Sequence, residues 1–462
     1  MVLLLTMVVL QSISFSNYAL TTKTTNIIYG SAPYLTFDGG RTRVTNTEAL
    51  LRISLSDGRT FTPTTNNSSS TNPIELPAIG QSFADIGMLV PTNTNSIALS
   101  SLIGTPYNYW GDDDGDGQGV NGVTATGSLG LSIRDKDNNS VARNEVPTIC
   151  KAPYKLTLSN GEGRLTTRYG VPNESRFTAG NATYYINPKA APVICYVRPG
   201  DFPNAGISAA VWDQVNRAFL PQSVTPSSYG LNFPTAGANN LWFNLDIGGV
   251  SQALSWAPVS HGGITATMTY PYERNTLVRV TLTGPAVTDS NQWYSANPDR
   301  IDRPSLPQVF ELVGRDSSGN AVVKYGFELK QWFVNRGDYR STPSNISPWC
   351  NKIGGYRLPK IRDLTNATCQ GRGSGYWCQG AVGGATPSSP NNLVSRHIGG
   401  GLVSEWGDMT HFANAYFTSS YLTQDRGVGS SRAFFYTVSA DDGGLYRGED
   451  IDRSYGGLCV YP

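Results

Sequence analysis

Residues 241–247 read LWFNLDI, a stretch in which every second side chain is a large aliphatic or aromatic group. In an extended chain, successive side chains point to opposite faces, so a period of two gathers the apolar groups on one face. The pattern predicts a half-buried strand of an antiparallel sheet. The apolar positions are Leu241, Phe243, Leu245 and Ile247.

The same period recurs along the chain, and turn residues separate the runs. Further alternating runs cover residues 51–55, 129–133, 154–158, 278–282 and 323–329. Ser56-Asp57-Gly58 follows the first of them and predicts a hairpin turn. Short strands joined by turns are typical of β-sandwiches and barrels. We therefore expect a mostly-β fold.

Helical periodicity is scarce. Four apolar residues lie four apart between residues 207 and 219, but Gly206 and the flanking prolines favour at most a short helix there. Residues 358–364, LPKIRDL, give a better pattern, because Pro359 suits a first helical turn and Ile361 and Leu364 share one face.

The composition excludes several classes of protein. The chain has 462 residues with 50 Gly, 28 Pro, 11% aromatic and only 15% charged residues, and its net charge is +1. A disordered chain has few aromatics and a large net charge, and a coiled coil is rich in Ala, Glu, Lys and Leu. A nucleic-acid-binding protein usually has a basic excess. The numbers favour a β-rich, loop-rich, extracellular protein that binds no nucleic acid.

Six cysteines, an even number, occur without a CxxC pair. This pattern favours disulfides formed in an oxidising compartment, with six buried free thiols as the alternative. Residues 295–307, SANPDRIDRPSLP, hold three prolines and predict a domain boundary. We therefore expect a β-sandwich region from 20 to 300, with two subdomains as an open alternative, and a C-terminal domain from 301 to 462.

The boundary divides the cysteines into two and four. Cys150 and Cys195 precede it and are expected to form one disulfide. In the C-terminal domain a nested pairing is preferred, although the other two pairings of four cysteines stay open. The nested disulfides are Cys369–Cys378, which closes a small loop, and Cys350–Cys459, which ties the start of the domain to its end.

A local acidic segment is the sharpest candidate for a metal site. Residues 110–117 read WGDDDGDG, which places Asp112, Asp114 and Asp116 at every second position. Alternate carboxylates in a tight turn can converge on a hard cation such as calcium. The twelfth position of an EF-hand loop needs Glu but holds Val123, so we expect a calcium loop of another type. The alternative is an exposed acidic turn.

Catalytic signatures are absent from the sequence. No nucleophile elbow, Walker loop or Rossmann glycine pattern occurs. Aromatics that could stack on sugar rings are better functional candidates, with core packing as the alternative for each. They occur at Tyr376-Trp377, Trp406 and Tyr416-Phe417.

The N-terminus has the character of an export signal. Residues 1–10, MVLLLTMVVL, are apolar but too short to span a bilayer, and small residues that suit cleavage follow. We expect residues 1–19 to be a secretory signal peptide. The alternative is a hydrophobic segment inside a longer polypeptide.

The C-terminal region resembles bacterial C-type lectin-like domains. Gly354-Gly355-Tyr356-Arg357-Leu358-Pro359, followed by Asp363-Leu364, matches their G-(W/Y)-R-L-P…(E/D)-L signature, and Gly457-Leu458-Cys459-Val460 matches their last strand. The sugar-binding motifs of the fold have partial counterparts in Ser389-Pro390-Asn391, without the carboxylate, and Trp406-Gly407-Asp408, without the asparagine. The resemblance implies an α+β lectin-like domain with a long loop before its last strands.

The whole chain is similar to enterobacterial surface adhesins related to invasin and intimin. Residues 107–117, 168–172, 183–189 and 260–267 carry the similarity, together with the lectin-like tail. It implies a cell-surface adhesin of the inverse-autotransporter type, with Ig-like β domains that end in a lectin-like tip. The outer-membrane anchor of that family is expected not to be present in this chain.

The expected function is therefore adhesion, at the bacterial surface or after secretion. The expected partner is a glycan or protein of a host cell, and calcium is the candidate cofactor. The alternatives are a secreted enzyme that acts on polysaccharide and a structural surface protein without a ligand. The candidate contact residues are Trp377, Glu405, Trp406, Asp408 and Tyr416.

Overall fold

The computed structural model describes residues 29–115, 117, 122–200, 205–272, 275–410, 412, 420–428, 433–448 and 455–462. The chain divides into two compact units, Met1–Lys189 and Ala190–Pro462, each with a hydrophobic core of its own. The segment predicted as a signal peptide lies outside the described residues. None of the helices in the described ranges has the length and apolar character that a membrane span requires.

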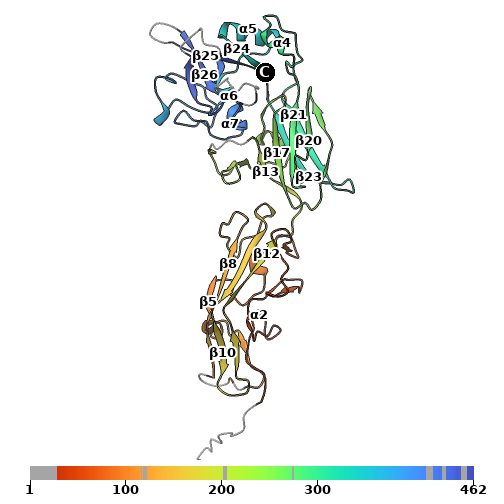
Figure 1. Cartoon of the computed structure of the whole chain (residues 1–462), viewed down its shortest axis with the longest axis vertical. Helices are drawn as coiled ribbons and strands as arrows, with labels where there is room; N and C mark the ends of the chain where they lie inside the picture. The colour runs from red at the N-terminus through yellow and green to blue at the C-terminus, as the bar shows by residue number, and fades with distance from the viewer. Residues whose placement is uncertain are drawn as a thin grey trace, which may run out of the picture. The chain divides into compact units, whose positions relative to one another are not determined.

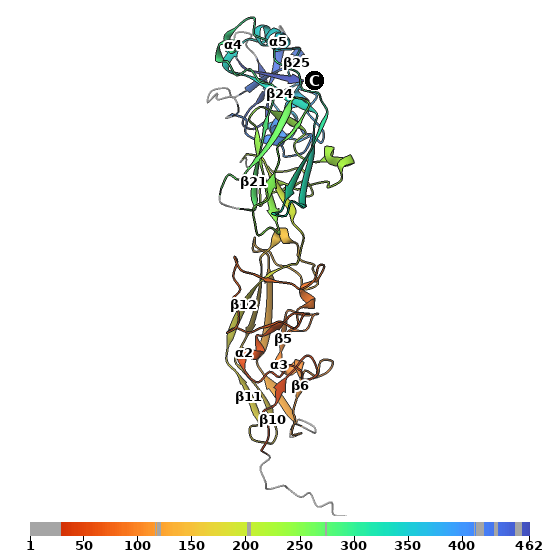
Figure 2. The ribbon, with the colours of Figure 1, turned by 90° about the vertical axis from the view of Figure 1, so that its right-hand side faces the viewer.

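The first unit is built around two sheets. The five-stranded sheet, in the order β4-β12-β9-β8-β5, contains Ile74–Glu75, Gly180–Asn187, Tyr154–Asn160, Ser128–Arg134 and Ser96–Ala98. The three-stranded sheet, in the order β11-β10-β7, contains Glu174–Phe177, Gly163–Thr167 and Val123–Thr126 (Figure 2). Every second residue of β8 and β9 is buried, as the runs 129–133 and 154–158 predict.

Short elements complete the first unit. They are β1 (Tyr34–Leu35) paired with β6 (Trp110–Gly111), β2 (Ile53–Ser54) paired with β3 (Thr60–Phe61), helices α2 (Thr47–Leu50) and α3 (Leu99–Leu102), and the 3-10 turns η1 (Phe83–Asp85) and η2 (Ile149–Lys151). Between β2 and β3 the Gly58 N–H donates to the Leu55 carbonyl at 3.0 Å. The predicted hairpin turn is therefore confirmed.

The second unit contains a β-sandwich. Its seven-stranded sheet, in the order β14-β15-β13-β17-β21-β20-β19, contains Trp212–Asp213, Ala218–Phe219, Val193–Arg198, Trp242–Gly248, Leu277–Thr283, Ile264–Thr269 and Val259–His261 (Figure 1). Its three-stranded sheet, in the order β18-β22-β23, contains Ser255–Trp256, Gln308–Arg315 and Ala321–Leu329. Phe243 of β17 packs edge-on against Phe327 of β23, with 5.9 Å between ring centroids, so the two sheets share one core. The alternating stretch 241–247 thus forms a sandwich strand, as predicted.

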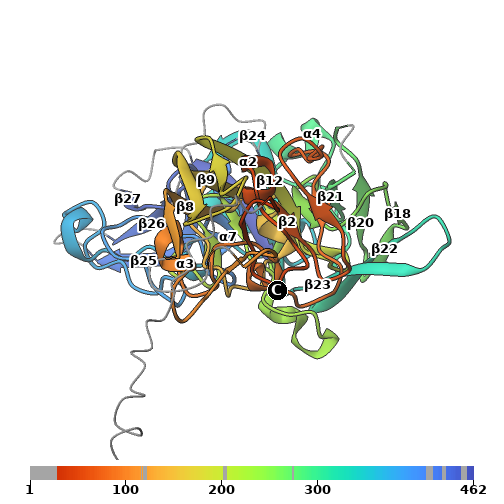
Figure 3. The same cartoon turned by 90° about the horizontal axis from the view of Figure 1, so that it is seen from below.

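A six-stranded sheet forms the C-terminal lobe, by which we mean residues 331–462 together with strand β16. In the order β16-β24-β28-β25-β26-β27 it contains Ala236–Ala238, Gln331–Ser341, Tyr455–Tyr461, Ser420–Val428, Ala433–Ser439 and Leu445–Gly448. Strands β25, β26 and β27 are neighbours (Figure 3). β16 directly precedes the sandwich strand β17 but pairs in parallel with β24, Ala236 opposite Gln331. The lobe therefore includes a strand from the sandwich half of the sequence.

Short helices accompany the two parts of the second unit. They are α4 (Ser290–Tyr294), α5 (Pro343–Lys352), α6 (Ile361–Leu364), α7 (Leu402–Trp406) and the 3-10 turns η3 (Pro226–Leu231) and η4 (Gly371–Gly373). α6 falls in the stretch predicted as a helix, and Ile361 and Leu364 are fully buried.

The segment 207–219 differs from its prediction. The apolar spacing of Ile207, Val211, Val215 and Phe219 favours at most a short helix, whereas the structure has the antiparallel strands β14 and β15. Val215 in the intervening turn is 71% exposed, and Arg217 adopts a positive φ of 49°. A hairpin can also place apolar residues at intervals of about four. The spacing alone therefore does not distinguish a helix from a hairpin.

The predicted boundary at residues 295–307 does not coincide with a change of sheet. β22 and β23, on its far side, pair with β18 and complete the sandwich, and the C-terminal sheet begins only with β24. The compact units divide at Lys189 instead, inside the predicted 20–300 region. The three prolines lie in a connection inside the second unit. Proline interrupts strands there in the same way as in a linker between two domains, so its presence does not distinguish the two.

All six cysteines are disulfide-bonded, so the alternative of free thiols is wrong. Cys350 of α5 pairs with Cys459 of β28, and Cys369 pairs with Cys378. This is the nested arrangement that the sequence favours. Cys150 and Cys195 are likewise disulfide-bonded.

Candidate functional site

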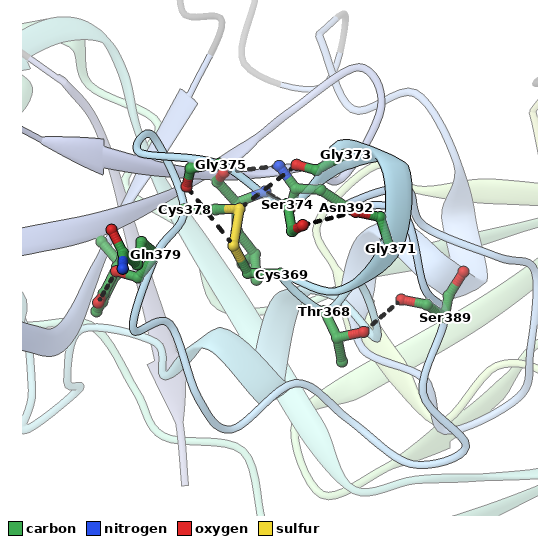
Figure 4. Close-up of a disulfide and its surroundings, with 12 residues drawn as sticks. Thr368, Cys369, Gly371, Gly373, Ser374, Gly375, Cys378, Gln379, Ser389 and Asn392 are labelled. Carbon is green, nitrogen blue, oxygen red and sulfur yellow. Dashed lines mark hydrogen bonds between the residues drawn. A yellow bond between two sulfur atoms is a disulfide. The ribbon is translucent and has the colours of Figure 1, made fainter.

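The candidate site is centred on residues 369–378 of the C-terminal lobe, which we call the disulfide loop (Figure 4). Its ends, Cys369 and Cys378, are joined covalently. Inside it the Ser374 hydroxyl donates to the Gly371 carbonyl at 2.6 Å, and the Cys378 N–H donates to the Gly375 carbonyl at 3.1 Å. Because these bonds satisfy backbone groups locally, the loop is compact without regular strand structure.

Residues 389–392 support the base of the disulfide loop. The N–H and the hydroxyl of Thr368 donate to the Ser389 carbonyl at 2.8 and 2.9 Å (Figure 4), and the Arg372 N–H donates to the Asn391 side chain at 2.8 Å. A Cβ at residue 373 would lie 1.8 Å from the Asn391 carbonyl oxygen. Only glycine permits this approach, so Gly373 is required for the loop to pack.

The sheet holds the far side of the disulfide loop. The Arg447 N–H of β27 donates to the Trp377 carbonyl at 2.5 Å, and the Tyr436 hydroxyl of β26 donates to the Gln379 carbonyl at 2.9 Å. The side chains of Tyr376 and Trp377 nevertheless remain 55% and 59% exposed. Large aromatic groups on a restrained loop suit a contact surface, because little conformational entropy is lost when a partner binds.

Arg447 adds a cation beside the two aromatic side chains. Its guanidinium lies 5.0 Å from the centre of the Tyr376 ring and 3.8 Å from that of Phe434. Tyr376, Trp377 and Arg447 together form what we call the aromatic face. Sequence reasoning missed Arg447, because its proximity to residue 377 depends on the pairing of β27 and leaves no local signal.

Glu405 and Trp406, predicted as contact residues, belong to the core. Their exposed fractions are 0% and 3%. The Glu405 carboxylate accepts hydrogen bonds from the backbone N–H groups of Thr235, Ala236 and Gly399 and from the Thr235 hydroxyl, at 2.5 to 3.1 Å. The indole N–H of Trp406 donates to the Ala236 carbonyl at 2.8 Å. Both side chains therefore join α7 to the region of β16, which contradicts a surface role.

Two buried charged groups lie in this part of the core. Burial raises the pKa of the Glu405 carboxyl, while its hydrogen bonds act in the opposite direction. Burial also lowers the pKa of the Arg396 guanidinium to about 9. The Arg396 guanidinium lies 4.6 Å from the centre of the Trp212 ring. These contacts link the C-terminal lobe to the sandwich strand β14, so we assign both charges a structural role.

The two remaining contact candidates have different outcomes. Asp408 is half-buried, and its Oδ1 accepts hydrogen bonds from the Thr410 N–H and hydroxyl at 2.8 and 2.6 Å. Tyr416 lies outside the described residues, as does Phe417. Trp377 is thus the largely exposed side chain among the predicted contact residues that the structure describes.

The acidic segment of the first unit is tied to the preceding chain. The Gly117 N–H donates to Asp112 Oδ2 at 2.7 Å, and Asp113 forms an ion pair with Arg43. Asp114 accepts hydrogen bonds from the Ser31 N–H and hydroxyl at 2.9 and 3.1 Å. Desolvation raises the pKa of Asp114, but the hydrogen bonds outweigh it, so that pKa is lowered overall.

Calcium binding by this segment stays a prediction. Asp116, the third expected ligand, lies outside the described residues. Within the ranges that the structure describes, no group of three His, Cys, Asp or Glu side chains is placed to hold a metal ion. The Oδ1 atom of Asp112 is buried and has no hydrogen-bond partner among the described residues.

Comparison with known proteins identifies a relative. No protein-family model matches the chain. Over 172 residues it is 24% identical to the inverse autotransporter adhesin YeeJ of Escherichia coli strain K12. Part of the chain is thus similar to part of an inverse autotransporter adhesin. The match covers 35% of this chain and 6% of YeeJ, so the chain spans a small part of that protein's length.

This similarity agrees with the adhesin resemblance and with the bacterial cell-surface location inferred from the sequence. The mostly-β fold class is confirmed by the sheets described above. YeeJ is named as an adhesin. The assignment of the C-terminal lobe as a C-type lectin-like domain stays a prediction.

Two solved structures align with about three quarters of the chain. Invasin, a bacterial integrin-binding protein, aligns with a TM-score of 0.35 and 13% identity over 74% of this chain and 52% of that one. The C-terminal 282-residue fragment of intimin, solved with the intimin-binding domain of its translocated receptor, aligns with a TM-score of 0.30 and 10% identity over 75% of this chain and 95% of the fragment. Both TM-scores are below 0.5.

Proposed function

We propose that this chain is the receptor-binding part of a bacterial surface adhesin, and that its aromatic face contacts a protein or glycan of a host cell. The observation that carries the proposal is the exposure of Trp377 on a loop that is restrained by a disulfide, by a hydrogen bond from β27 and by a bond from β26 to the adjoining Gln379. Trp, Tyr and Arg, the three residue types of the aromatic face, are those that most often dominate binding energy at interfaces. The relationship to an adhesin supports the proposal.

The geometry favours binding over catalysis. A polysaccharide-acting enzyme needs an accessible carboxyl group with a shifted pKa. Glu405 has a raised pKa, but it is 0% exposed and its oxygens are occupied by four donors. It therefore offers no acid to a substrate.

Replacement of Trp377 by alanine tests the proposal. We expect binding of the full chain to cultured host epithelial cells, measured by flow cytometry, to fall about 30-fold, because truncation of a dominant interface tryptophan costs on the order of 2 kcal/mol. The thermal unfolding temperature should not change, since the side chain is 59% exposed.

Tyr272→Ala provides the matched control, because Tyr272 is 64% exposed but lies in the sandwich part of the unit. It should leave cell binding unchanged. Full binding by the Trp377 variant, or an equal loss in both variants, would contradict the proposal. Treatment of the cells with protease or with glycosidases before the assay separates a protein receptor from a glycan.

A further inference from the structure

A cavity of about 770 Å³ lies within the second unit, where the sandwich meets the C-terminal lobe. The sandwich side contributes the residues that lead into β17 and the segment that follows β21, and the lobe contributes β24 and the residues after α7. This volume falls in the range of pockets that hold small organic ligands. The cavity is separate from the disulfide loop, none of whose residues line it.

Aromatic rings contribute to the apolar part of the lining, together with aliphatic side chains. Trp242 is 37% exposed, and the Arg279 guanidinium lies 3.8 Å from its ring centre. The indole N–H of Trp293 donates to the Val287 carbonyl at 2.8 Å. With that polar atom satisfied within the protein, the ring offers carbon surface to the cavity. Phe333 of β24 also belongs to the lining and is 0% exposed, so Trp242 and Trp293 are the rings that the proposal uses.

Polar side chains lie beside these rings. The Oδ1 atom of Asn239 accepts a hydrogen bond from the Gly284 N–H at 3.1 Å, which leaves its amide hydrogens as donors toward the cavity or solvent. Asn240 is exposed and adopts a positive φ of 67°. Asp408 uses Oδ1 for Thr410, so Oδ2 keeps its acceptor capacity. The lining therefore combines amide donors with a carboxylate acceptor.

The charge of the lining narrows the class of ligand. Among the described residues that line the cavity, Asp408 is the one with a charge. Arg279 lies against the Trp242 ring but is not itself one of the lining residues. A phosphorylated, sulfated or sialylated ligand would therefore meet the Asp408 carboxylate and no lysine or arginine of the described lining. A purely apolar ligand would desolvate Asn239, Asn240 and Asp408 without giving them partners, which is unfavourable. A neutral, hydroxyl-rich ligand satisfies both constraints.

We propose that this cavity binds a neutral saccharide of one to a few sugar units. The C–H faces of a sugar ring pack on the aromatic side chains, and its hydroxyls exchange hydrogen bonds with Asn239, Asn240 and Asp408. The cavity shares no residue with the aromatic face. Saccharide binding by the cavity and receptor contact by the aromatic face are therefore two proposals that can be tested separately.

The first measurement is a glycan array probed with the purified full chain. The array carries neutral glycans beside sialylated and sulfated forms of the same cores. The neutral mono- to trisaccharide with the strongest signal is then titrated by isothermal calorimetry, up to about 10 mM ligand. A single site with preference for neutral over anionic forms is expected. Absence of saccharide binding, or a preference for the anionic forms, overturns the proposal.

Two variants locate the site. Asn240→Gly removes the amide but suits the positive φ of the backbone, so the fold is kept. Trp242→Ala removes a ring of the lining. Each should weaken saccharide affinity at least about tenfold, with Tm measured in parallel to verify folding. If both variants fold and keep the affinity of the unmodified chain, the saccharide binds elsewhere and the proposal fails.

Trp377→Ala is the matched control for this experiment. It lies outside the cavity lining and should keep full saccharide affinity while it loses cell binding. Loss of saccharide affinity in this variant would move the sugar site to the aromatic face and overturn the cavity proposal. If Trp377→Ala leaves cell binding unchanged, the proposed receptor contact is contradicted, and the saccharide proposal is not affected.

Discussion

At the scale of single residues, the Glu405 carboxylate organises the region where α7 meets β16. It accepts four hydrogen bonds from three residues while it is fully buried. Three of the donors are backbone N–H groups, which have no other way to be satisfied once water is excluded. Loss of acceptor capacity at this position therefore leaves buried donors unpaired, which is more costly than loss of a typical hydrogen bond.

Glu405→Gln tests this role. The amide NH2 of glutamine cannot accept from the N–H groups that face one carboxylate oxygen, so we expect the free energy of unfolding to fall by about 1 to 3 kcal/mol. Urea unfolding followed by fluorescence measures the change. Glu328→Gln, on the sandwich surface beside Lys330, is the control and should change the free energy by less than about 0.5 kcal/mol. Equal stability of the Glu405 variant and the unmodified chain would show that the four bonds contribute little.

The same residues show what sequence reasoning could reach. Trp377 and Trp406 both lie in loop-rich sequence, yet the first is 59% exposed and the second 3%. The Trp406 N–H bonds to Ala236, 170 positions earlier in the chain. A pattern within the neighbouring sequence does not indicate a partner so far away, so the burial of Trp406 could not be predicted. The disulfide loop could be predicted, because Cys369 and Cys378 are only nine positions apart.

At the scale of elements, the strands were the predictable part. Alternation is a local property, and the runs at 129–133 and 154–158 lie in β8 and β9 with the expected residues buried. The hairpin of β14 and β15 was missed, because an interval of four suits both a helix and two strands joined by a tight turn. The parallel pairing of β16 with β24 has no signature within either strand.

The two disulfides of the lobe should differ in their effect on stability. Cys350–Cys459 spans 109 positions and Cys369–Cys378 spans nine. The entropy that a cross-link removes from the unfolded chain grows with loop length, so removal should cost about 5 kcal/mol for the first and about 3 kcal/mol for the second. Calorimetry of the variants Cys350→Ala/Cys459→Ala and Cys369→Ser/Cys378→Ser measures both.

The shorter bridge should matter more for binding. Hydrogen exchange in the Cys369→Ser/Cys378→Ser variant should be faster across residues 370–377, and cell binding should weaken. A larger loss of stability from the short bridge than from the long one would contradict the unfolded-chain explanation.

At the scale of the whole molecule, we infer that the second unit unfolds as a single cooperative unit. Its hydrophobic core runs from Ile194 to Val460 without division between sandwich and lobe. Phe233, from the sandwich half of the sequence, packs at 4.9 Å from Trp406 of the lobe. The proline-rich segment 295–307 therefore lies inside a cooperative unit, and composition alone could not distinguish it from a linker.

Two fragments test this interpretation. A fragment of residues 190–462, with Cys195→Ser to exclude an unpaired thiol, should unfold in a single cooperative transition. A fragment of residues 301–462 lacks β16, Thr235 and Phe233 and should show no cooperative transition, because the contacts that bury Glu405 and Trp406 are missing. Circular dichroism during heating measures both. Cooperative unfolding of the shorter fragment would show that residues 301–462 fold alone, which would support a domain boundary near residue 300.

The bond between Cys350 and Cys459 also has a mechanical consequence. If tension is applied to the two ends of the lobe, the load passes from β24 through α5 and across the sulfur atoms into β28. The 109-position stretch between the two cysteines is bypassed, and the disulfide loop lies within it. Such a load would strain the covalent frame formed by β24, α5 and β28, while the disulfide loop kept its shape.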